Sequence, residues 1–145
     1  MIKRILNWFQ AVKPNPTATD VMVQVGCHFE EVAEMADALY MDETNVVLQE
    51  EADWFKHQKD SNDNAQTVSD FSKLELLDAL CDQVVTALGV GYMMGMDIEG
   101  ALSEVCRSNE SKFENGKPVF DANGKIAKGK NYTAPDLRRF LGEKK

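Results

Sequence analysis

The sequence predicts an all-α fold of about five helices, with a short C-terminal hairpin or loop and a closing helix. Two observations predict the helices. Apolar residues recur at spacings of three and four through five segments, which is the period of an amphipathic helix. Capping residues or prolines separate these segments. At 145 residues the chain has the length of one domain, and we expect a single domain over residues 1–145.

The first three predicted helices fill the N-terminal part of the chain. One covers residues 1–12 and ends before Pro14. The second begins after the side-chain oxygens of Thr17, Thr19 and Asp20 and continues to about Met41. The third follows residues 42–44, and the polar residues 57–68 after it are expected to form a loop. Their apolar stripes are Ile5, Trp8, Phe9 and Val12; Val25, Phe29, Val32, Ala36 and Leu39; and Leu48, Ala52 and Phe55.

The remaining elements are predicted after residue 70. A fourth helix spans about residues 70–94 and is apolar almost all round, which favours burial on more than one side. A fifth begins after Asp97 and continues to about Phe113. Asn-Gly pairs predict a hairpin that joins residues 119–120 to 125–126, and Pro135 suits the first turn of a closing helix. The stripe of the fourth helix is Leu74, Leu77, Cys81, Val84 and Leu88.

The composition limits the classes of partner. A net charge of −8 disfavours a protein that binds nucleic-acid backbones, since such proteins neutralise phosphates with Lys and Arg. It leaves a nucleotide ligand open, because a bound divalent cation can reverse the local charge. We find no run near 18 apolar residues and no signal peptide, so we expect no membrane span and a cytoplasmic protein. Cys27, Cys81 and Cys106 are predicted to be buried free thiols.

Two of the predicted helices carry strips of carboxylates. Glu31 and Glu34 lie about 60° apart on the second helix. Glu75, Asp78 and Asp82 share one strip of the fourth. Each strip taken alone is most simply a solvated face. However, the strip on the second helix lacks the lysines four residues on that surface helices often carry. Two such strips facing each other would form a cage of hard oxygen ligands suited to Mg²⁺.

The order of motifs resembles one known family. Residues 30–34 (EEVAE) match the EExxE start of the MazG-like nucleoside triphosphate pyrophosphohydrolases, the superfamily that includes phosphoribosyl-ATP pyrophosphohydrolases and dimeric dUTPases. Gly95-Met96-Asp97, Ala101-Leu102 and Asn109 with Lys112-Phe113 then follow in the family's order. The resemblance covers roughly residues 25–113 and implies a MazG-like helical bundle as the fold of a single domain over residues 1–145. The tail from Gly124 to Leu137 resembles the phage-borne branch, which would place the protein in a host cytoplasm.

The resemblance implies an enzyme that splits (deoxy)nucleoside triphosphates into a monophosphate and pyrophosphate in nucleotide-pool control. Its cofactor would be one to three Mg²⁺ or Mn²⁺ ions held by Glu31, Glu34, Asp78, Asp82 and Glu75. Glu34 or Glu75 would accept the proton of the attacking water. The gap after Glu34 is longer than the family pattern, and Glu50 with Asp53 is a rival to the Asp78/Asp82 pair.

The same resemblance implies the substrate contacts and the assembly. Lys112, Lys125 and Lys128 would meet phosphate oxygens, and Asn109 would contact the sugar or base. The simpler alternatives are surface lysines and a residue that helps to end its helix. The assembly implied is a homodimer or tetramer, and a purine deoxynucleotide such as dGTP or dATP is a candidate substrate. Two other readings stay open: hydrolysis of phosphoribosyl-ATP, and a non-catalytic acidic helical binding protein.

Overall fold

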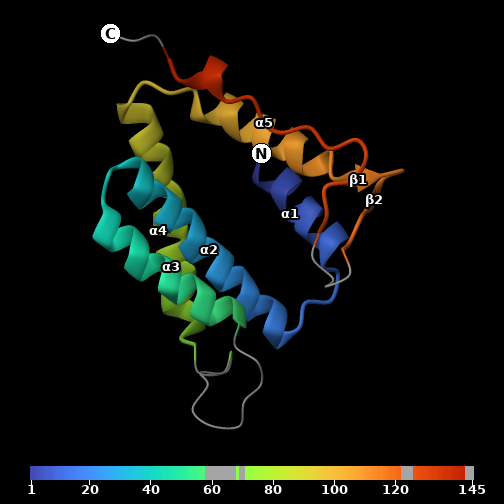
Figure 1. The fold of residues 1–145 in the computed structure, drawn as a ribbon, viewed down its shortest axis with the longest axis horizontal. Helices are drawn as coiled ribbons and strands as arrows, with labels where there is room; N and C mark the ends of the chain where they lie inside the picture. Colours follow the sequence, from blue (N-terminus) through green and yellow to red (C-terminus); the bar gives the residue numbers. More distant parts are fainter. Residues whose placement is uncertain (58–67, 69–70, 122–125, 143–145) are drawn as a thin grey trace. The chain divides into compact units, whose positions relative to one another are not determined.

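The computed structural model is mostly helical and describes residues 1–57, 68, 71–121 and 126–142 (Figure 1). Within these residues it has five α-helices, a two-stranded hairpin and one 3₁₀ turn. The all-α fold class is therefore confirmed. Of the predicted loop over residues 57–68, the structure describes only His57 and Val68. His57 still belongs to a helix. The elements are α1 (Ile2–Val12), α2 (Ala18–Ala38), α3 (Asp42–His57), α4 (Lys73–Met93), α5 (Ile98–Glu110), β1 (Phe113–Glu114), β2 (Lys117–Pro118) and η2 (Arg138–Phe140).

The chain divides into two compact units. One consists of residues Asn15–Ser72 and contains α2 and α3. The other joins Met1–Pro14 to Lys73–Lys145 and contains all the remaining elements. The prediction of a single domain over residues 1–145 stays a prediction.

The α2–α3 unit is a helical hairpin held by close contact. The predicted cap is present, since the Thr17 and Asp20 side chains each accept a hydrogen bond from the other's backbone N–H. Gly26 lies directly on α3, where a Cβ atom would stand 2.6 Å from the Ala52 carbonyl oxygen. The ring of Phe29 stacks on that of Phe55 with centroids 5.6 Å apart. The residues of this hairpin that are buried are small or flexible: Met22, Gly26, Ala33, Ala36 and Ala52.

Helix α2 ends earlier than the sequence predicts. Its last residue is Ala38 rather than about Met41, because Tyr40 takes a positive φ of 59° that no helix continues through. Leu39, expected in the apolar stripe, is 55% exposed as a result.

The other unit is organised around α5. Asp97 caps the helix by accepting the Gly100 N–H at 2.9 Å, as predicted. The helix ends at Glu110 rather than about Phe113, because Phe113 begins β1. Asn115 and Gly116, both with positive φ, turn the chain between β1 and β2. The predicted pairing of residues 119–120 with 125–126 is present as one bridge, between Phe120 and Ile126. The expected closing helix is only the short 3₁₀ turn η2.

Helix α4 contradicts two expectations, the burial of its apolar stripe and the burial of Cys81. Its apolar residues were expected to be buried, yet Leu74 is 79% and Leu77 61% exposed. Cys81, on the same helix, is an exposed thiol rather than a buried one, whereas Cys106 is buried and Cys27 half-buried. By length and composition alone α4 could also cross a membrane, although we expected no such segment. The criterion is a weak one, because core helices of many proteins meet it too.

Candidate functional site

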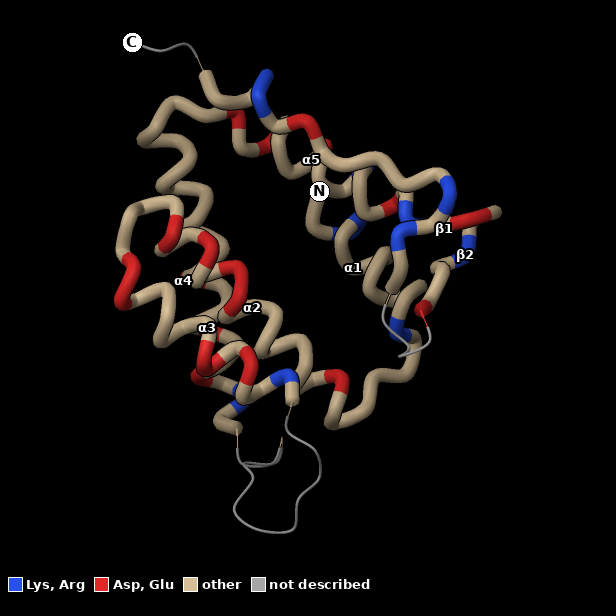
Figure 2. The backbone as a smooth tube through the Cα atoms, viewed as in Figure 1, with Lys and Arg blue, Asp and Glu red and all other residues tan. Residues whose placement is uncertain are grey.

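The α2–α3 hairpin carries a dense group of carboxylates along both helices (Figure 2). On α2, Glu30, Glu31 and Glu34 follow one another within a little more than one turn. Glu30 is engaged, since its carboxylate lies 2.5 Å from the Lys56 ammonium group of α3. Glu31 and Glu34, the two residues predicted to bind metal, are exposed.

The surroundings of Glu31 disfavour its ionised form. Its pKa is raised above the ordinary value of 4.5, first by partial desolvation of the carboxylate and then by the negative charges of Glu34 and Glu30. Both causes penalise the ionised form. A cation bound at this position would remove part of that penalty. The chemistry of the Glu31/Glu34 pair therefore fits a hard divalent cation.

The rival second half of the site belongs to the same unit. Glu50 and Asp53 lie on α3, the helix that packs against α2, and both are exposed. Their spacing of three residues repeats that of Glu31 and Glu34. The fold brings the two pairs onto neighbouring helices.

The predicted second half lies on α4. Glu75, Asp78 and Asp82 form an exposed strip at spacings of three and four, as expected. They belong to the other compact unit, not to the unit of Glu31 and Glu34. In the part of the chain that the structure describes, no three acidic, histidine or cysteine side chains gather closely enough to hold a metal ion. The predicted five-residue ligand set stays a prediction.

Two of the four predicted substrate contacts lie together beside α1. The Trp8 indole N–H donates to the backbone carbonyl of Asn109 at 3.1 Å, which leaves the Asn109 side-chain amide unused by this contact. The Lys112 ammonium group lies 5.9 Å from the centroid of the Trp8 ring. The ring of Phe113 stacks on that of Trp8, with centroids 6.3 Å apart. Asn109 and Lys112 thus both contact Trp8.

The other two predicted contacts are placed differently. Lys128 is exposed, and its ammonium group lies 4.9 Å from the centroid of the Tyr132 ring. Lys125 lies outside the described residues.

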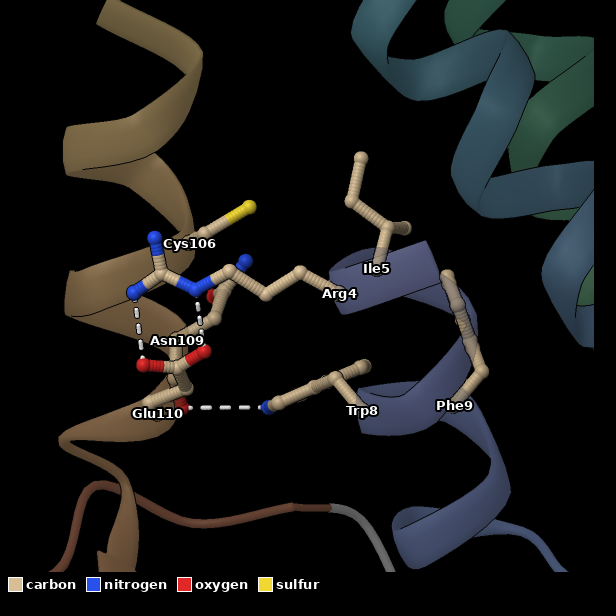
Figure 3. A pocket seen from close by; sticks show the side chains of 7 residues that line it. All are labelled: Arg4, Ile5, Trp8, Phe9, Cys106, Asn109 and Glu110. Atoms are coloured by element: carbon tan, nitrogen blue, oxygen red, sulfur yellow. Dashed lines mark hydrogen bonds and ion pairs between the residues drawn. The ribbon is translucent and has the colours of Figure 1, made fainter. Parts of the chain in front are cut away.

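The cavity between α1 and α5 is structural. Its volume is about 70 Å³, room for about two water molecules and not for a nucleotide. One wall is a bidentate pair in which the Arg4 guanidinium donates to both Glu110 carboxylate oxygens, at 2.5 and 2.7 Å (Figure 3). The pKa of Glu110 is lowered by this pairing. The seven lining residues are Arg4, Ile5, Trp8, Phe9, Cys106, Asn109 and Glu110.

One acidic residue of structural importance was not singled out from the sequence. Glu104 is buried and accepts hydrogen bonds from the Arg107 guanidinium at 2.8 and 2.7 Å and from the Asp136 N–H at 3.1 Å. These partners lower its pKa from 4.5 to about 2, with the Arg107 hydrogen bonds as the largest cause. Glu104 therefore fastens the C-terminal segment to α5. The three-residue spacing from Glu104 to Arg107 was the only signal available in the sequence.

Comparison with known proteins adds no relative: the chain matches no family model, no curated protein and no solved structure.

Proposed function

We propose that the chain is a Mg²⁺-dependent pyrophosphohydrolase that converts nucleoside triphosphates into monophosphates and pyrophosphate. The observation that carries the proposal is the exposed Glu31/Glu34 pair on α2, where desolvation of the Glu31 carboxylate and then the negative charges of Glu34 and Glu30 raise the pKa of Glu31. The order of motifs along residues 25–113 supplies the reaction class, as described above.

Two helices compete to complete the set of metal ligands. Asp78 and Asp82 of α4, with Glu75, keep the spacing to Gly95 that the family pattern implies. Glu50 and Asp53 of α3 have the advantage that α3 already packs against α2. When bound, Mg²⁺ or Mn²⁺ would neutralise phosphate charge and acidify a water molecule.

The chain's own residues have defined tasks in the proposed reaction. Glu34 or Glu75 accepts the proton of the water that attacks the α-phosphorus. A bond forms between the water oxygen and this phosphorus, while the bond to the oxygen that bridges the α- and β-phosphorus breaks and pyrophosphate leaves. Lys112 and Lys128 meet phosphate oxygens as point charges, as would Lys125. The side-chain amide of Asn109, whose backbone carbonyl accepts from Trp8, contacts the sugar or base.

The proposed assembly is a homo-oligomer, a dimer or a tetramer. The exposed apolar residues of α4 support it, because a helix with this composition is normally covered. Hydrolysis of phosphoribosyl-ATP is the sibling reaction, and the identity of the monophosphate product separates the two.

The test is a product assay on the purified full chain. Incubation with Mg²⁺ or Mn²⁺ and a panel of NTPs and dNTPs, dGTP and dATP included, should release pyrophosphate. Glu34→Gln should abolish the release, whereas the matched variant Glu51→Gln, an exposed glutamate of α3 outside both candidate ligand sets, should retain it. Release of orthophosphate, or metal binding without turnover, would reject the proposal in favour of another hydrolase or a non-catalytic binding protein.

A second pair of variants decides between α3 and α4. Asp82→Asn removes a carboxylate oxygen from the α4 set and Asp53→Asn does so in the α3 set, and both residues are exposed. We expect the two turnover rates to differ by at least about 100-fold, since a lost metal ligand affects the chemical step directly. The slower variant identifies the helix that binds the metal.

A further inference from the structure

The charges of the chain are divided unevenly between its two compact units. Residues Asn15–Ser72 carry thirteen Asp and Glu against two Lys, a net charge of −11. The remaining residues carry fourteen Lys and Arg against eleven Asp and Glu, a net charge of +3. The expectation against nucleic-acid binding rested on the total of −8, so it does not apply to the second of these units taken alone.

The positive charge gathers in α1 and in the C-terminal part of the chain. Residues 1–14 and 107–145 together carry thirteen Lys and Arg against five Asp and Glu. The fold brings these stretches together, because α1 packs against α5 and β2. In Figure 2 the Lys and Arg positions lie along α1 and around β1 and β2. These stretches therefore form a basic region in an otherwise acidic chain.

Three lysines of the basic region are available to an anionic ligand. Among the residues that the structure describes, the ammonium groups of Lys3, Lys112 and Lys117 form no ion pair with a carboxylate. Lys3 and Lys117 are exposed, and Lys112 is half-buried. Glu110, at the end of α5, is already paired with Arg4 and does not compensate these three charges.

An open pocket with an aromatic wall lies within the basic region. It has a volume of about 460 Å³, in the range of small-molecule sites. The rings of Trp8 and Phe113 in its wall are stacked within 21° of parallel. The Trp8 indole N–H donates to the Asn109 carbonyl, which fixes the orientation of the ring. The six lining residues are Lys3, Arg4, Asn7, Trp8, Glu110 and Phe113.

Ammonium groups lie beside two aromatic rings of this region. The Lys112 ammonium group is 5.9 Å from the centroid of the Trp8 ring. The Lys128 ammonium group is 4.9 Å from that of the Tyr132 ring. Each pair places a positive charge next to a flat apolar surface, which are the two groups that the phosphate and the base of a nucleotide require.

We propose that the basic region binds single-stranded nucleic acid, with one base stacked on the Trp8 and Phe113 rings and phosphates beside the lysines. A single strand fits better than a duplex, since only unpaired bases offer their faces to aromatic side chains. A strand also fits better than a mononucleotide, because lysines continue beyond those that line the pocket, at Lys117 and Lys130. An acidic peptide would use the lysines but not the stacked rings. Such binding is independent of the proposed reaction.

The first test is fluorescence anisotropy with labelled oligonucleotides of about 15 nucleotides, oligo(dT) and oligo(U), on the full chain in EDTA. We expect both or one of them to bind at about 50 mM NaCl, and the two arms tell DNA from RNA. Raising the salt to about 200 mM should weaken binding by on the order of 50–100-fold, as about four or five phosphate contacts require. A duplex of the same length should bind more weakly than the single strand.

The second test removes single charges. Lys3→Gln and Lys117→Gln should each weaken binding of the single strand by about 3–5-fold and lower the slope of log affinity against log salt by about 0.7. The matched control is Lys73→Gln, an exposed lysine of α4 in the same compact unit but outside the basic region, which should have no effect. None of the three belongs to the proposed substrate contacts.

The third test removes the stacking surface. Trp8→Leu should weaken binding by about 5–100-fold, the range measured when a base loses its aromatic partner. Trp8→Phe loses the same hydrogen bond to Asn109 but keeps a flat ring, so it should retain most of the affinity. Circular dichroism should show the same helix content in both variants, and the lysine variants decide the question if Trp8→Leu does not fold.

Several outcomes would overturn the proposal. They are no binding of either strand at about 10 μM protein, equal binding of the duplex, and a Trp8→Leu variant that folds and binds like the wild type. Competition by dTTP at the same nucleotide concentration as the strand would assign the pocket to a mononucleotide, and equal competition by polyglutamate would assign it to acidic peptides. Because EDTA removes the metal from these measurements, a failed product assay leaves them unchanged, and a failed binding assay leaves the product assay unchanged.

Discussion

Helices α2 and α4 have equal length but opposite surroundings. Each has 21 residues and an acidic strip. α2 buries Gly26, Ala33 and Ala36, whereas the larger apolar residues of α4 remain exposed. Small residues let α2 and α3 approach closely, so that contact is satisfied within one unit. Burial within the α2–α3 unit therefore follows the shape of the contact surface more than its hydrophobicity.

The largest difference between the helices should appear when a glycine of each is changed to alanine. At Gly26 the added methyl group would lie 2.6 Å from the Ala52 carbonyl oxygen and 2.7 Å from Lys56 Cγ, so the helices must separate. Gly26→Ala should lower the free energy of unfolding by about 1–3 kcal/mol. At Gly89 of α4 nothing lies within 4 Å of an added Cβ atom. Gly89→Ala should therefore raise the free energy of unfolding by about 0.5–1 kcal/mol. Urea denaturation measures both, and equal signs would contradict the comparison.

A second contrast uses large apolar side chains. Phe29 is half-buried and stacked on Phe55, so Phe29→Ala should lower the free energy of unfolding by about 1–2 kcal/mol. Leu77→Ala on α4 should change it by less than about 0.5 kcal/mol, since Leu77 is 61% exposed. A cost for Leu77→Ala equal to that of Phe29→Ala would show that α4 is packed within the chain.

Glu104 should make stability depend on acid pH. Its folded-state pKa of about 2 lies below its ordinary value of 4.5. The ionised carboxylate therefore stabilises the fold above pH 4.5, and this stabilisation is lost as the pH falls toward 2. Glu104→Gln should lower the urea midpoint at pH 7, and the gap to the wild type should narrow between pH 4.5 and 2. A gap that stays constant with pH would show that Glu104 acts through packing alone.

The smallest effect concerns Glu31. Because its pKa is raised, the ionised form is penalised in the fold at neutral pH, and the penalty disappears as the pH falls below 4.5. Glu31→Gln should therefore slightly raise the urea midpoint at pH 7 without metal. Added Mg²⁺ should stabilise the wild type and Glu51→Gln but not Glu31→Gln. Equal Mg²⁺ stabilisation of all three would remove Glu31 from the proposed metal site.

The elements that depend on neighbouring residues were predictable from the sequence. The caps at Thr17 and Asp97 act within three residues, and both helices begin where those residues predicted. The turn at Asn115-Gly116 is equally local. It joins β1 to β2, a pairing that comes earlier in the chain than the expected one between residues 119–120 and 125–126.

The contacts between distant residues were not predictable. Arg4 and Glu110 are separated by 106 positions, and nothing in either segment indicates the other. In the sequence alone, Glu104 cannot be told from a solvated glutamate. Its hydrogen bond from the Asp136 N–H joins residues that are 32 positions apart. For the candidate site, the spacing of Glu31 and Glu34 predicted the α2 half, which stays a prediction. Spacing alone could not choose between α3 and α4, because both helices repeat the same acidic pattern.

The most direct measurement of the proposed function is the fate of oxygen in labelled water. Hydrolysis of a dNTP in H₂¹⁸O with Mg²⁺ should place one ¹⁸O atom in the nucleoside monophosphate and none in the pyrophosphate, as mass spectrometry of the two products would show. This result follows from attack on the α-phosphorus. Label in pyrophosphate, or release of labelled orthophosphate, would mean attack at another phosphorus and would contradict the proposed function.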